Sequence, residues 1–340
     1  MKILITGGAG FIGCNGADTF LQQGHTVVIF DNLSRVGGPA NLEWLHERHG
    51  RERFHFVRGD IRDYSTLAGA MDESPDAVLH LAGQVAVTTS VQNPREDFEI
   101  NALGTFNVLE AVRHYCPGAA VLYASTNKVY GGMEEVGFVE QATRYTYADY
   151  PQGIPESYPL DFHSPYGCSK GAGDQYTIDY ARIYGLKTLV LRQSCIYGRR
   201  QFGVEDQGWV AHFIIAAVKE RPITIFGDGK QVRDLLHIDD LIRAYQLGIQ
   251  KIDELSGTAL NLGGGPANTI SIWVELKPIL ESLLEQEIPV IHKEWRPGDQ
   301  RVFIADIQQA ARKLGWRPTI SPEAGIRDLY NWVSANLHLF

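Results

Sequence analysis

Short apolar runs alternate with amphipathic stretches through the first 190 residues of the chain. The runs are apolar nearly throughout, which is typical of strands that are buried on both faces of a parallel sheet. The stretches between them have the spacing of helices. We predict strands at 2–6, 26–30, 54–57, 77–81, 119–124 and 188–192. We predict helices near 11–23, 40–49, 64–72, 101–115 and 168–184.

This alternation predicts an α/β fold with a doubly wound parallel sheet of the Rossmann type. After residue 192 the pattern becomes irregular and richer in Gly, Pro, Arg and Gln. We therefore predict a first domain at 1–192 and a smaller mixed α/β domain at 193–340. Residues 235–250 are expected to return to the first sheet as a strand and a helix. Residues 132–163 show no period, and we expect a substrate-side loop or lid there.

Composition excludes several classes of protein. The 340 residues include 31 Lys and Arg against 40 Asp and Glu, a net charge of −9, which argues against a nucleic-acid or anionic-membrane partner. No run approaches the ~18 apolar residues of a membrane span, and no signal peptide is visible. The cysteines have no metal-binding spacing, so we expect no metal and a reducing, cytoplasmic location. They are Cys14, Cys116, Cys168 and Cys195.

A glycine-rich turn follows the first predicted strand. Gly7, Gly10 and Gly13 form this turn, and Phe11 and Ile12 begin the helix after it. Glycine lets backbone amides approach a pyrophosphate, and a helix N-terminus favours negative charge. Because the motif joins an apolar strand to a helix, it predicts a dinucleotide site rather than a plain tight turn.

The cofactor is predicted to be NAD. Asp31 ends the second strand 18 residues after Gly13 (31 − 13), near the ~20 expected for an acid that binds the ribose and repels a 2′-phosphate. Asp60 is a candidate for the adenine amino group, although it and Asp63 are alternative caps of the next helix, with Asp63 the better fit. Further residues are expected to line the cofactor, after strand ends or at the start of the helix 101–115: Asn32, Ile61, Leu81, Ala82, Gly83 and Asn101.

A Tyr-x-x-x-Lys motif joins Tyr166 to Lys170, and a hydroxyl pair, Ser125 and Thr126, follows the fifth strand. On a helix, residues four apart share one face. An ammonium beside a phenol stabilises the phenolate and makes it a usable base. Together these groups predict a site that deprotonates an alcohol while NAD takes the hydride.

These residues resemble the extended short-chain dehydrogenase/reductase family of NAD-dependent epimerases and dehydratases, over essentially the whole chain. The resemblance implies an isomerase with bound NAD, a C-terminal nucleotide-sugar domain, and a homodimer through helices 101–115 and 168–184. It also implies that Thr126, Tyr166 and Lys170 are catalytic, with Tyr166 and Lys170 against the cofactor as well.

The resemblance further implies a set of residues for a nucleoside-diphosphate sugar. Arg233 and Arg296 match the family's diphosphate-binding arginines, with internal salt bridges as the alternative role. The remaining members are Gln84, Thr88, Ser125, Asn127, Lys128, His163, Cys195 and Asp299.

Two departures narrow the chemistry. Asn127 and Lys128 stand where the family's 4,6-dehydratases carry an Asp-Glu pair, which disfavours elimination of water. Cys195 stands where 4-epimerases often carry Asn, which weakens a 4-epimerase assignment.

Longer matches at 125–131, 161–172, 200–203 and 206–209 resemble the CDP-paratose (CDP-tyvelose) 2-epimerase subgroup. The function that this implies is a nucleotide-sugar 2-epimerase acting by transient oxidation at C2. A UDP-hexose 4-epimerase, a catalytically silent NAD-binding scaffold and an NADPH-linked reductase are the alternatives, the last disfavoured by Asp31. The base and the exact sugar stay open.

Overall fold

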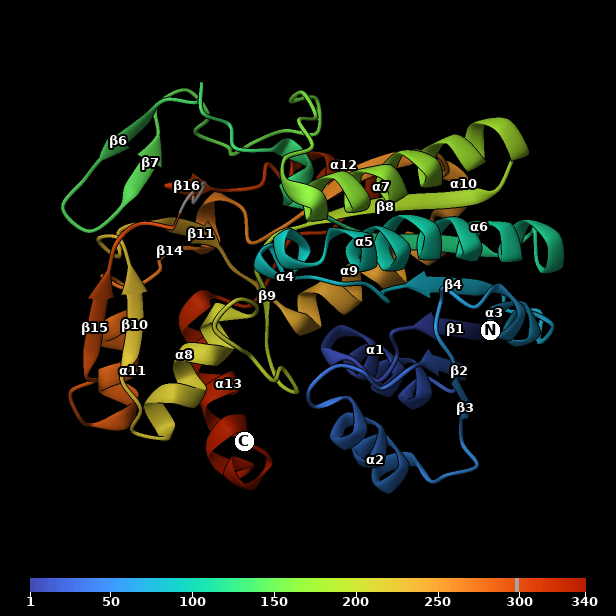
Figure 1. Ribbon diagram of the computed structural model, residues 1–340, viewed down its shortest axis with the longest axis horizontal. Coiled ribbons are helices and arrows are strands. Elements are labelled where there is room, and N and C mark those ends of the chain that lie inside the picture. Colours follow the sequence, from blue (N-terminus) through green and yellow to red (C-terminus); the bar gives the residue numbers. More distant parts are fainter. Residues whose placement is uncertain (297–299) are drawn as a thin grey trace. The chain divides into compact units, whose positions relative to one another are not determined.

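The structure is a computed structural model that describes residues 1–296 and 300–340. The chain forms two compact units (Figure 1). Unit 1 comprises 1–129, 162–192 and 242–260, and unit 2 comprises 130–161, 193–241 and the described part of 261–340. The units differ from the predicted domains in two places, because spatial contact rather than chain order defines them. Residues 130–161 belong to unit 2, and the segment that returns to unit 1 is 242–260 rather than 235–250.

A seven-stranded sheet forms the centre of unit 1, in the order β13-β8-β5-β4-β1-β2-β3. The pairs from β5 to β3 are parallel, as predicted. The strand order reverses at β1, with β2 on one side and β4 on the other. The strands are β1 (Lys2–Thr6), β2 (Thr26–Asp31), β3 (His55–Arg58), β4 (Ala77–His80), β5 (Ala120–Thr126), β8 (Lys187–Gln193) and β13 (Thr258–Leu262).

Helices cover both faces of this sheet (Figure 1). Leu4, Val28 and Val121 pack in one cluster with α3, α6 and α7, whereas Leu122 meets Gly248 of α9 on the other face. Val121 and Leu122 face opposite sides of the sheet because successive side chains of a pleated strand alternate between its two faces. The helices are α1 (Phe11–Gln22), α2 (Gly38–His49), α3 (Tyr64–Met71), α4 (Val87–Gln92), α5 (Pro94–Phe98), α6 (Gly104–Tyr115), α7 (Ser164–Tyr184), α9 (Ile238–Gln250) and α10 (Ile252–Leu255), with a π-helix η1 (Glu99–Leu103) and a 3₁₀ turn η2 (Asn127–Tyr130).

The predicted helix positions are confirmed with small shifts at their ends. Asp63 caps α3 by accepting hydrogen bonds from the amides of Ser65 and Thr66, so it takes the capping role in preference to Asp60. α7 begins four residues earlier than predicted, at Ser164, with proline in its first turn. Among the described residues, no helix is both long and apolar enough to cross a membrane.

An ion pair is buried between α7 and the sheet. Asp174 of α7 accepts hydrogen bonds from Nε and Nη2 of Arg192 at 2.9 and 3.0 Å, and both residues are at most 5% exposed. Ser125 of β5 donates to the same carboxylate at 2.7 Å. Good geometry and full hydrogen bonding are what a buried pair needs to offset its desolvation.

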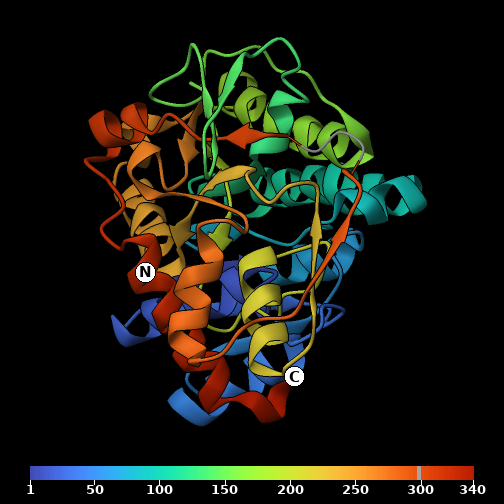
Figure 2. The ribbon, with the colours of Figure 1, turned by 90° about the vertical axis from the view of Figure 1, so that its left-hand side faces the viewer.

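Unit 2 packs helices against small sheets. Its core cluster joins Ile214, Trp273, Leu280 and Leu329, and Figure 2 shows the yellow, orange and red helices α8, α11 and α13 packed together. The helices are α8 (Trp209–Val218), α11 (Leu276–Leu284), α12 (Gln308–Leu314) and α13 (Pro322–Ala335), with 3₁₀ turns η3 (Pro266–Asn268) and η4 (Leu337–Leu339). The strands are β6 (Phe138–Glu140), β7 (Tyr145–Tyr147), β9 (Ile196–Tyr197), β10 (Ile223–Phe226), β11 (Val232–Asp234), β12 (Leu236–His237), β14 (Thr269–Ser271), β15 (Val290–Lys293) and β16 (Val302–Phe303).

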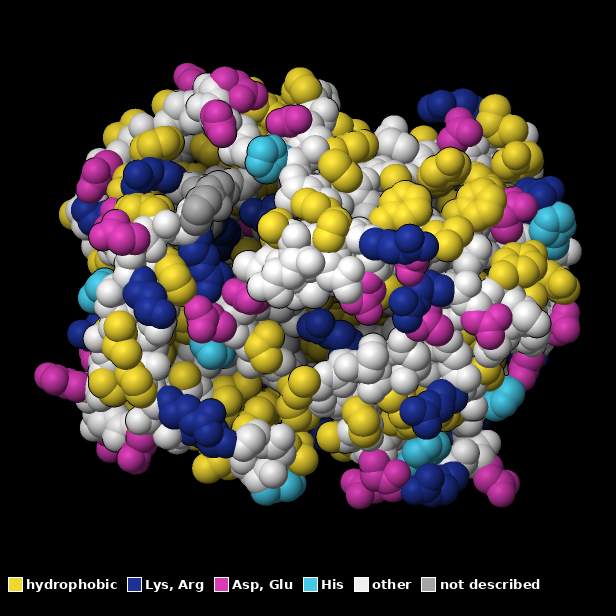
Figure 3. All heavy atoms as spheres, in the orientation of Figure 1, with side chains coloured by type: hydrophobic (Ala, Val, Ile, Leu, Met, Phe, Trp, Pro, Cys, Tyr) yellow, Lys and Arg dark blue, Asp and Glu magenta, His cyan; other side chains and the backbone are white. Residues whose placement is uncertain are grey.

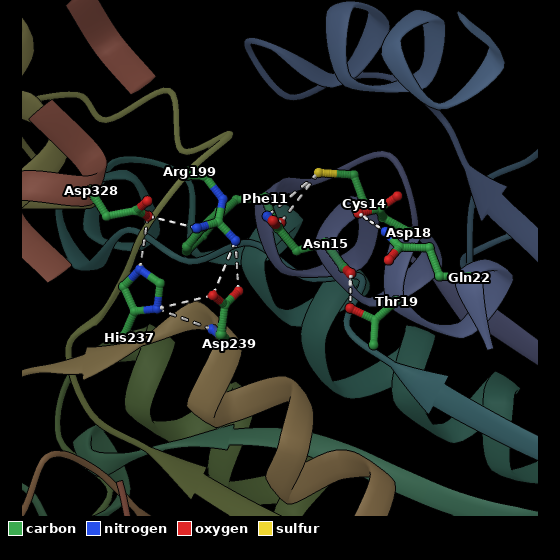
Figure 4. A network of polar contacts seen from close by, with 10 residues as sticks. All are labelled: Phe11, Cys14, Asn15, Asp18, Thr19, Gln22, Arg199, His237, Asp239 and Asp328. Atoms are coloured by element: carbon green, nitrogen blue, oxygen red, sulfur yellow. Dashed lines mark hydrogen bonds and ion pairs between the residues drawn. The ribbon is translucent and has the colours of Figure 1, made fainter. Parts of the chain in front are cut away.

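A polar network joins three elements of unit 2. Arg199 binds Asp239 at 2.9 Å and Asp328 at 2.7 Å, and the ring of the buried His237 lies 3.2 Å from Asp328 (Figure 4). The network ties the start of α9 to α13.

Residues 132–163, where the sequence shows no period, include an antiparallel hairpin of β6 and β7. Arg144 holds the hairpin turn by bonding both carboxylate oxygens of Glu275, and Tyr145 bonds Asp228 at 2.5 Å. Each strand has three residues, and those of β6 are all exposed. A period of two cannot be recognised over so short a span.

Replacing Arg192 with methionine leaves the Asp174 carboxylate buried without its cation. We expect Arg192→Met to lower the free energy of unfolding by about 3–5 kcal/mol, measured by urea titration. Arg182→Met is the matched control, since Arg182 pairs with Asp179 on the surface of α7 and is 70% exposed. That control should change stability by less than about 1 kcal/mol. If both variants lost the same free energy of unfolding, the buried ion pair would be no more important to stability than the exposed one.

Candidate active site

The turn between β1 and α1 brings backbone atoms so close that side chains are excluded. A Cβ at Gly13 would lie 2.2 Å from the Gly7 oxygen, and one at Gly7 would lie 2.7 Å from the nitrogen of Ala82. Gly10 precedes α1 without a side-chain cap. Helix geometry leaves the first-turn amides without partners inside the helix. The turn therefore fits a pyrophosphate, which such amides and the helix dipole bind.

The first turn of α1 carries the half-buried Phe11 and Ile12 beside these amides. The side-chain amide of Asn15 donates to the Phe11 carbonyl at 2.8 Å (Figure 4). This contact adds a side-chain hydrogen bond to the first turn of α1, at the predicted cofactor turn.

Asp31 lies at the end of β2, next to the glycine turn. Its carboxylate accepts the amides of Ala9 at 3.0 Å and of Leu33 at 2.7 Å. Burial raises the pKa of Asp31, while the backbone hydrogen bonds act in the opposite direction. The carboxylate is thus held where the sequence predicts an acceptor for ribose hydroxyls.

Asn32 and Asp60 are linked at the neighbouring strand ends. Asn32 donates to Asp60 at 2.9 Å, and Arg62 donates twice to the same carboxylate at 2.9 and 2.8 Å. The hydrogen bonds from Arg62 are the main cause that lowers the pKa of Asp60 to about 2. The side chain of Ile61 instead packs in the core against Gly104, so only its backbone is available to a ligand.

The end of β4 completes this edge of the sheet. The amide of Leu81 donates to the Thr6 carbonyl at 3.1 Å, and that of Ala82 to the Thr6 hydroxyl at 3.3 Å. A Cβ at Gly83 would lie 2.9 Å from Oδ1 of Asn101. β1 and β4 flank the point where the strand order reverses, which is where open α/β sheets bind ligands. The structure brings the predicted cofactor residues together at this edge.

Thr126, Tyr166 and Lys170 gather beside it. Thr126 ends β5, and its hydroxyl lies near enough to the Tyr166 phenol to lower the pKa of that phenol. One helical turn further on, the Lys170 ammonium donates to the Ala124 carbonyl at 2.6 Å and lies 4.2 Å from the ring centre of Tyr123. All three predicted catalytic side chains are at most 7% exposed.

Burial opposes charge on both titratable groups. It lowers the pKa of Lys170 to about 7, against the charges of Asp174 and Asp97, which act in the opposite direction. It raises the pKa of Tyr166 to about 12, partly offset by the bond to Thr126. Each pKa is therefore sensitive to any charge brought into the site, which is the usual condition of an acid–base centre.

Asn127 and Lys128 surround the Thr126 hydroxyl. That hydroxyl donates to Oδ1 of Asn127 at 3.4 Å and accepts the Lys128 amide at 3.2 Å. Two further predicted substrate residues lie on neighbouring helices: Thr88 is half-buried on α4, and His163 is exposed immediately before α7.

Ser125, a predicted substrate residue, makes its side-chain contact inside unit 1. Its hydroxyl is buried and donates to Asp174 inside the unit. Successive side chains of a strand face opposite ways, so Ser125 shares the α7 side of β5 with Tyr123. Gln84 is also committed within unit 1, where its side-chain amide donates to Asp97 at 2.8 Å.

The other predicted substrate residues belong to unit 2. Arg296 pairs with Glu205 at 2.9 Å and Asp206 at 3.3 Å and lies 4.0 Å above the ring of Phe226, so it makes the internal salt bridges considered as its alternative role. Arg233 donates to the Val232 carbonyl at 2.8 Å. Cys195 is half-buried with a φ of 24°. Asp299 lies outside the described residues.

Sequence reasoning missed the buried polar residues behind the site. Asp97 and Ser169 are at most 3% exposed and bond each other at 2.5 Å. Asp97 follows Arg95 and Glu96, which are both exposed, so the sequence offers no sign of which charge is buried. Ser169 precedes Lys170 in the Tyr-x-x-x-Lys motif, and that position was the one available signal.

The fold and these side chains define a dinucleotide-dependent enzyme of the Rossmann class. Residues 4–329 match the family described as GDP-mannose 4,6-dehydratase. The chain is 48% identical to a CDP-paratose 2-epimerase of Salmonella typhi, over 98% of this chain and 100% of that protein.

The fold is also similar to solved structures of nucleotide-sugar epimerases. A UDP-glucose 4-epimerase from Thermotoga maritima, solved with UDP-glucose, has a TM-score of 0.84 at 31% identity and covers 99% of this chain and 100% of its own. A UDP-glucuronic acid 4-epimerase from Bacillus cereus, solved with UDP-glucuronic acid and NAD, has a TM-score of 0.84 at 28% identity and covers 98% and 99%. The chain belongs to the GDP-mannose 4,6-dehydratase family of NAD-dependent epimerases and dehydratases.

Adding one methyl group at Gly13 tests the glycine turn. We expect Gly13→Ala to abolish NAD binding and to lower stability, because rigid backbone occupies the space that a Cβ needs. Calorimetric NAD titration and urea unfolding measure the two effects. Gly69→Ala in α3 is the control: nothing lies within 4 Å of its added Cβ, and helix propensity should raise stability by about 1 kcal/mol. A Gly13→Ala protein with wild-type affinity for NAD would refute the assignment.

Proposed function

We propose that this protein is a nucleotide-sugar 2-epimerase of the CDP-paratose/CDP-tyvelose type that works with tightly bound NAD. The observation that carries the proposal is the buried cluster of Thr126, Tyr166 and Lys170 at the edge of the glycine turn. The choice of C2 and of a CDP-sugar is supported by the 48% identity to the Salmonella typhi CDP-paratose 2-epimerase over the full length of both chains.

The cluster supplies acid–base chemistry at one hydroxyl. Tyr166, as phenolate, takes the proton from the C2 hydroxyl, and Thr126 orients that hydroxyl through a shared hydrogen bond. Lys170 favours the phenolate by its positive charge. Bound NAD would supply a reversible hydride acceptor for C2, so the net redox change would be zero. Tyr166 gives its proton back to the oxygen of the 2-keto sugar when the hydride returns to the other face.

Elimination of water is disfavoured by the residues that follow Thr126. The Thr126 hydroxyl contacts Oδ1 of Asn127 and the backbone amide of Lys128. The side chains at these two positions are an amide and an ammonium, and neither can replace a carboxyl group in acid–base elimination. The protein is therefore proposed as an isomerase, although the family's name refers to a dehydratase.

Arg233 and Arg296 are proposed to bind the diphosphate of the nucleotide sugar. The two carboxylates that pair with Arg296 are 52% and 42% exposed. Such pairs are worth only about 0–1 kcal/mol, so a diphosphate can replace them at little cost. A bidentate guanidinium suits this ligand.

Two other functions are the alternatives to a 2-epimerase. A UDP-hexose 4-epimerase would use the same cluster, and relatives named UDP-glucose 4-epimerase are 31–32% identical to this chain. The position of Cys195, where the resemblance leads one to expect Asn, argues against it. A silent NAD-binding scaffold would have no need of a buried Tyr166 bonded to Thr126.

Product analysis tests the proposal directly. We expect incubation with CDP-tyvelose or CDP-paratose, with NAD and no external reductant, to invert C2 alone, as followed by NMR of the products. GDP-mannose and UDP-glucose tested in parallel identify the accepted base. Tyr166→Phe should lower kcat by about 10²–10⁴-fold with NAD still bound, since it removes the proton acceptor.

Tyr64→Phe is the matched control for this experiment, because Tyr64 is exposed at the start of α3. It should retain full activity. Inversion at C4 would replace the proposal with the 4-epimerase, and wild-type activity in Tyr166→Phe would overturn the mechanism.

We also propose that two copies of the chain form a homodimer through α6 and α7. Large apolar side chains are exposed along these helices, and Figure 3 shows hydrophobic side chains gathered over them. They are Phe106, Tyr115, Tyr176, Ile183 and Tyr184, from 38% to 64% exposed. Exposed apolar surface of this kind is typical of an interface, and the family resemblance implies a second copy as the partner.

A charge placed on α7 tests the dimer. Ile183→Asp should raise the dimer dissociation constant by about 30-fold or more, since loss of a central contact costs about 2 kcal/mol. Light scattering across a concentration series measures this change. Val139→Asp is the control, because Val139 is 51% exposed on β6, outside the proposed interface. A wild-type protein that stays monomeric throughout would refute the dimer.

A further inference from the structure

A carboxylate lies buried behind the catalytic cluster, in α5. Asp97 is 1% exposed. Its Oδ2 accepts the Ser169 hydroxyl at 2.5 Å, and its Oδ1 accepts the side-chain amides of Gln84 at 2.8 Å and Asn101 at 3.1 Å. These bonds satisfy the oxygen atoms but come from neutral donors. Within the described part of the chain, Asp97 contacts no ammonium or guanidinium at ion-pair distance, so its negative charge has no direct partner.

The groups around the Lys170 ammonium show where this charge acts. From β5 come the Tyr123 ring and the Ala124 carbonyl. From β4 comes His80, which burial keeps neutral by lowering its pKa to about 3. From α7 itself come the phenol of Tyr166, one turn away, and Asp174, and from α5 comes Asp97.

The two carboxylates are not equivalent. Asp174 already forms two hydrogen bonds with the Arg192 guanidinium at 2.9 and 3.0 Å. Asp174 has the larger effect on the Lys170 ammonium, but it also balances the charge of Arg192. Asp97 raises the pKa of Lys170 as well, and its hydrogen bonds come from neutral donors.

We propose that Asp97 is a positioning residue that holds the catalytic turn of α7 in place and balances the charge of Lys170 from behind. The proposal rests on the function proposed above, in which Lys170 acts as an ammonium beside Tyr166. Burial alone would leave the pKa of Lys170 lower still, and Asp97 is one of the two charges that oppose this effect.

The positioning half of the proposal follows the hydrogen bonds. Ser169 bonds Asp97 and also donates to the Tyr166 carbonyl at 3.2 Å, so Asp97 is tied to the turn between the two catalytic residues. The side chain of Asn101 forms two hydrogen bonds with the backbone of Gln84: it accepts from the Gln84 amide at 2.9 Å and donates to the Gln84 carbonyl at 3.0 Å. Asn101 lies in the π-helix η1, a wide turn that is often found at functional sites. Asp97 thereby connects the loop after β4 to α7.

Direct titration of Lys170 tests the charge without any sugar substrate. The NAD-bound full-length protein is labelled with ¹³C at lysine Cε, and the Lys170 signal is assigned by its loss in Lys170→Arg. We expect Asp97→Asn, which removes the charge and keeps the shape, to lower the pKa of Lys170 by about 1 unit. Asp97→Glu should restore most of this shift.

Glu96→Gln is the matched control, since Glu96 is the exposed neighbour of Asp97 on the same helix and loses the same charge. It should leave the Lys170 titration unchanged. Ser169→Ala removes a hydrogen bond but no charge, so it should also leave the titration in place while lowering kcat more than it changes KM. Thermal unfolding of each variant establishes that it is folded at the titration temperature.

The rate profile gives a second readout. The ammonium is the active form of Lys170, so a lower pKa means that the proton is lost at lower pH. The high-pH limb of kcat/KM should therefore move to lower pH in Asp97→Asn and stay fixed in Glu96→Gln. A folded Asp97→Asn protein with an unmoved Lys170 titration would overturn the proposal.

Failure of this inference and failure of the proposed function have different signatures. If the protein is an active 2-epimerase but Asp97→Asn leaves the Lys170 pKa unchanged, only the proposed role of Asp97 is contradicted. A protein that turns over none of the sugars, yet shows the Lys170 shift, defeats the 2-epimerase assignment and supports the role of Asp97.

Discussion

The close packing of α7 against β5 is the constraint on which the rest of the site depends. A Cβ at Gly173 would lie 2.5 Å from the Tyr123 hydroxyl, and that hydroxyl donates to the Lys170 carbonyl at 3.2 Å. The buried pair of Asp174 and Arg192 fixes the same helix to the next strand. Because interiors transmit strain rather than absorb it, these contacts set the height of the helix above the sheet and hence the place of its catalytic turn.

The same burial that positions the site also governs its electrostatics. Lys170 and Tyr166 are both removed from water, and both therefore resist ionisation. A site built in this way responds to each charge that enters it, because a low local dielectric strengthens every interaction. The buried carboxylates of Asp97 and Asp174 are thus part of the acid–base design, even though neither is a candidate to touch the sugar.

Related folds carry different reactions, and the difference here resides in a few side chains. The glycine turn, Asp31 and the Tyr166–Lys170 pair fit redox chemistry at a hydroxyl in general. The amide and ammonium that follow Thr126 favour the proposed epimerisation over elimination, since the side chains of a site, and not the fold, specify a reaction. The family name and the proposed activity therefore differ without contradiction.

The sequence by itself determined the parallel sheet, its helices and the edge where a dinucleotide site is predicted, since buried strands and glycine turns leave local patterns. It also indicated Thr126, Tyr166 and Lys170 through spacing and resemblance. Tertiary structure alone decided that Ser125 faces inward to Asp174, that 130–161 forms part of unit 2 with a hairpin, and that Asp97 is buried while Glu96 is exposed. The physical reason is that burial and hydrogen-bond partners depend on residues distant in the chain, which no local pattern records.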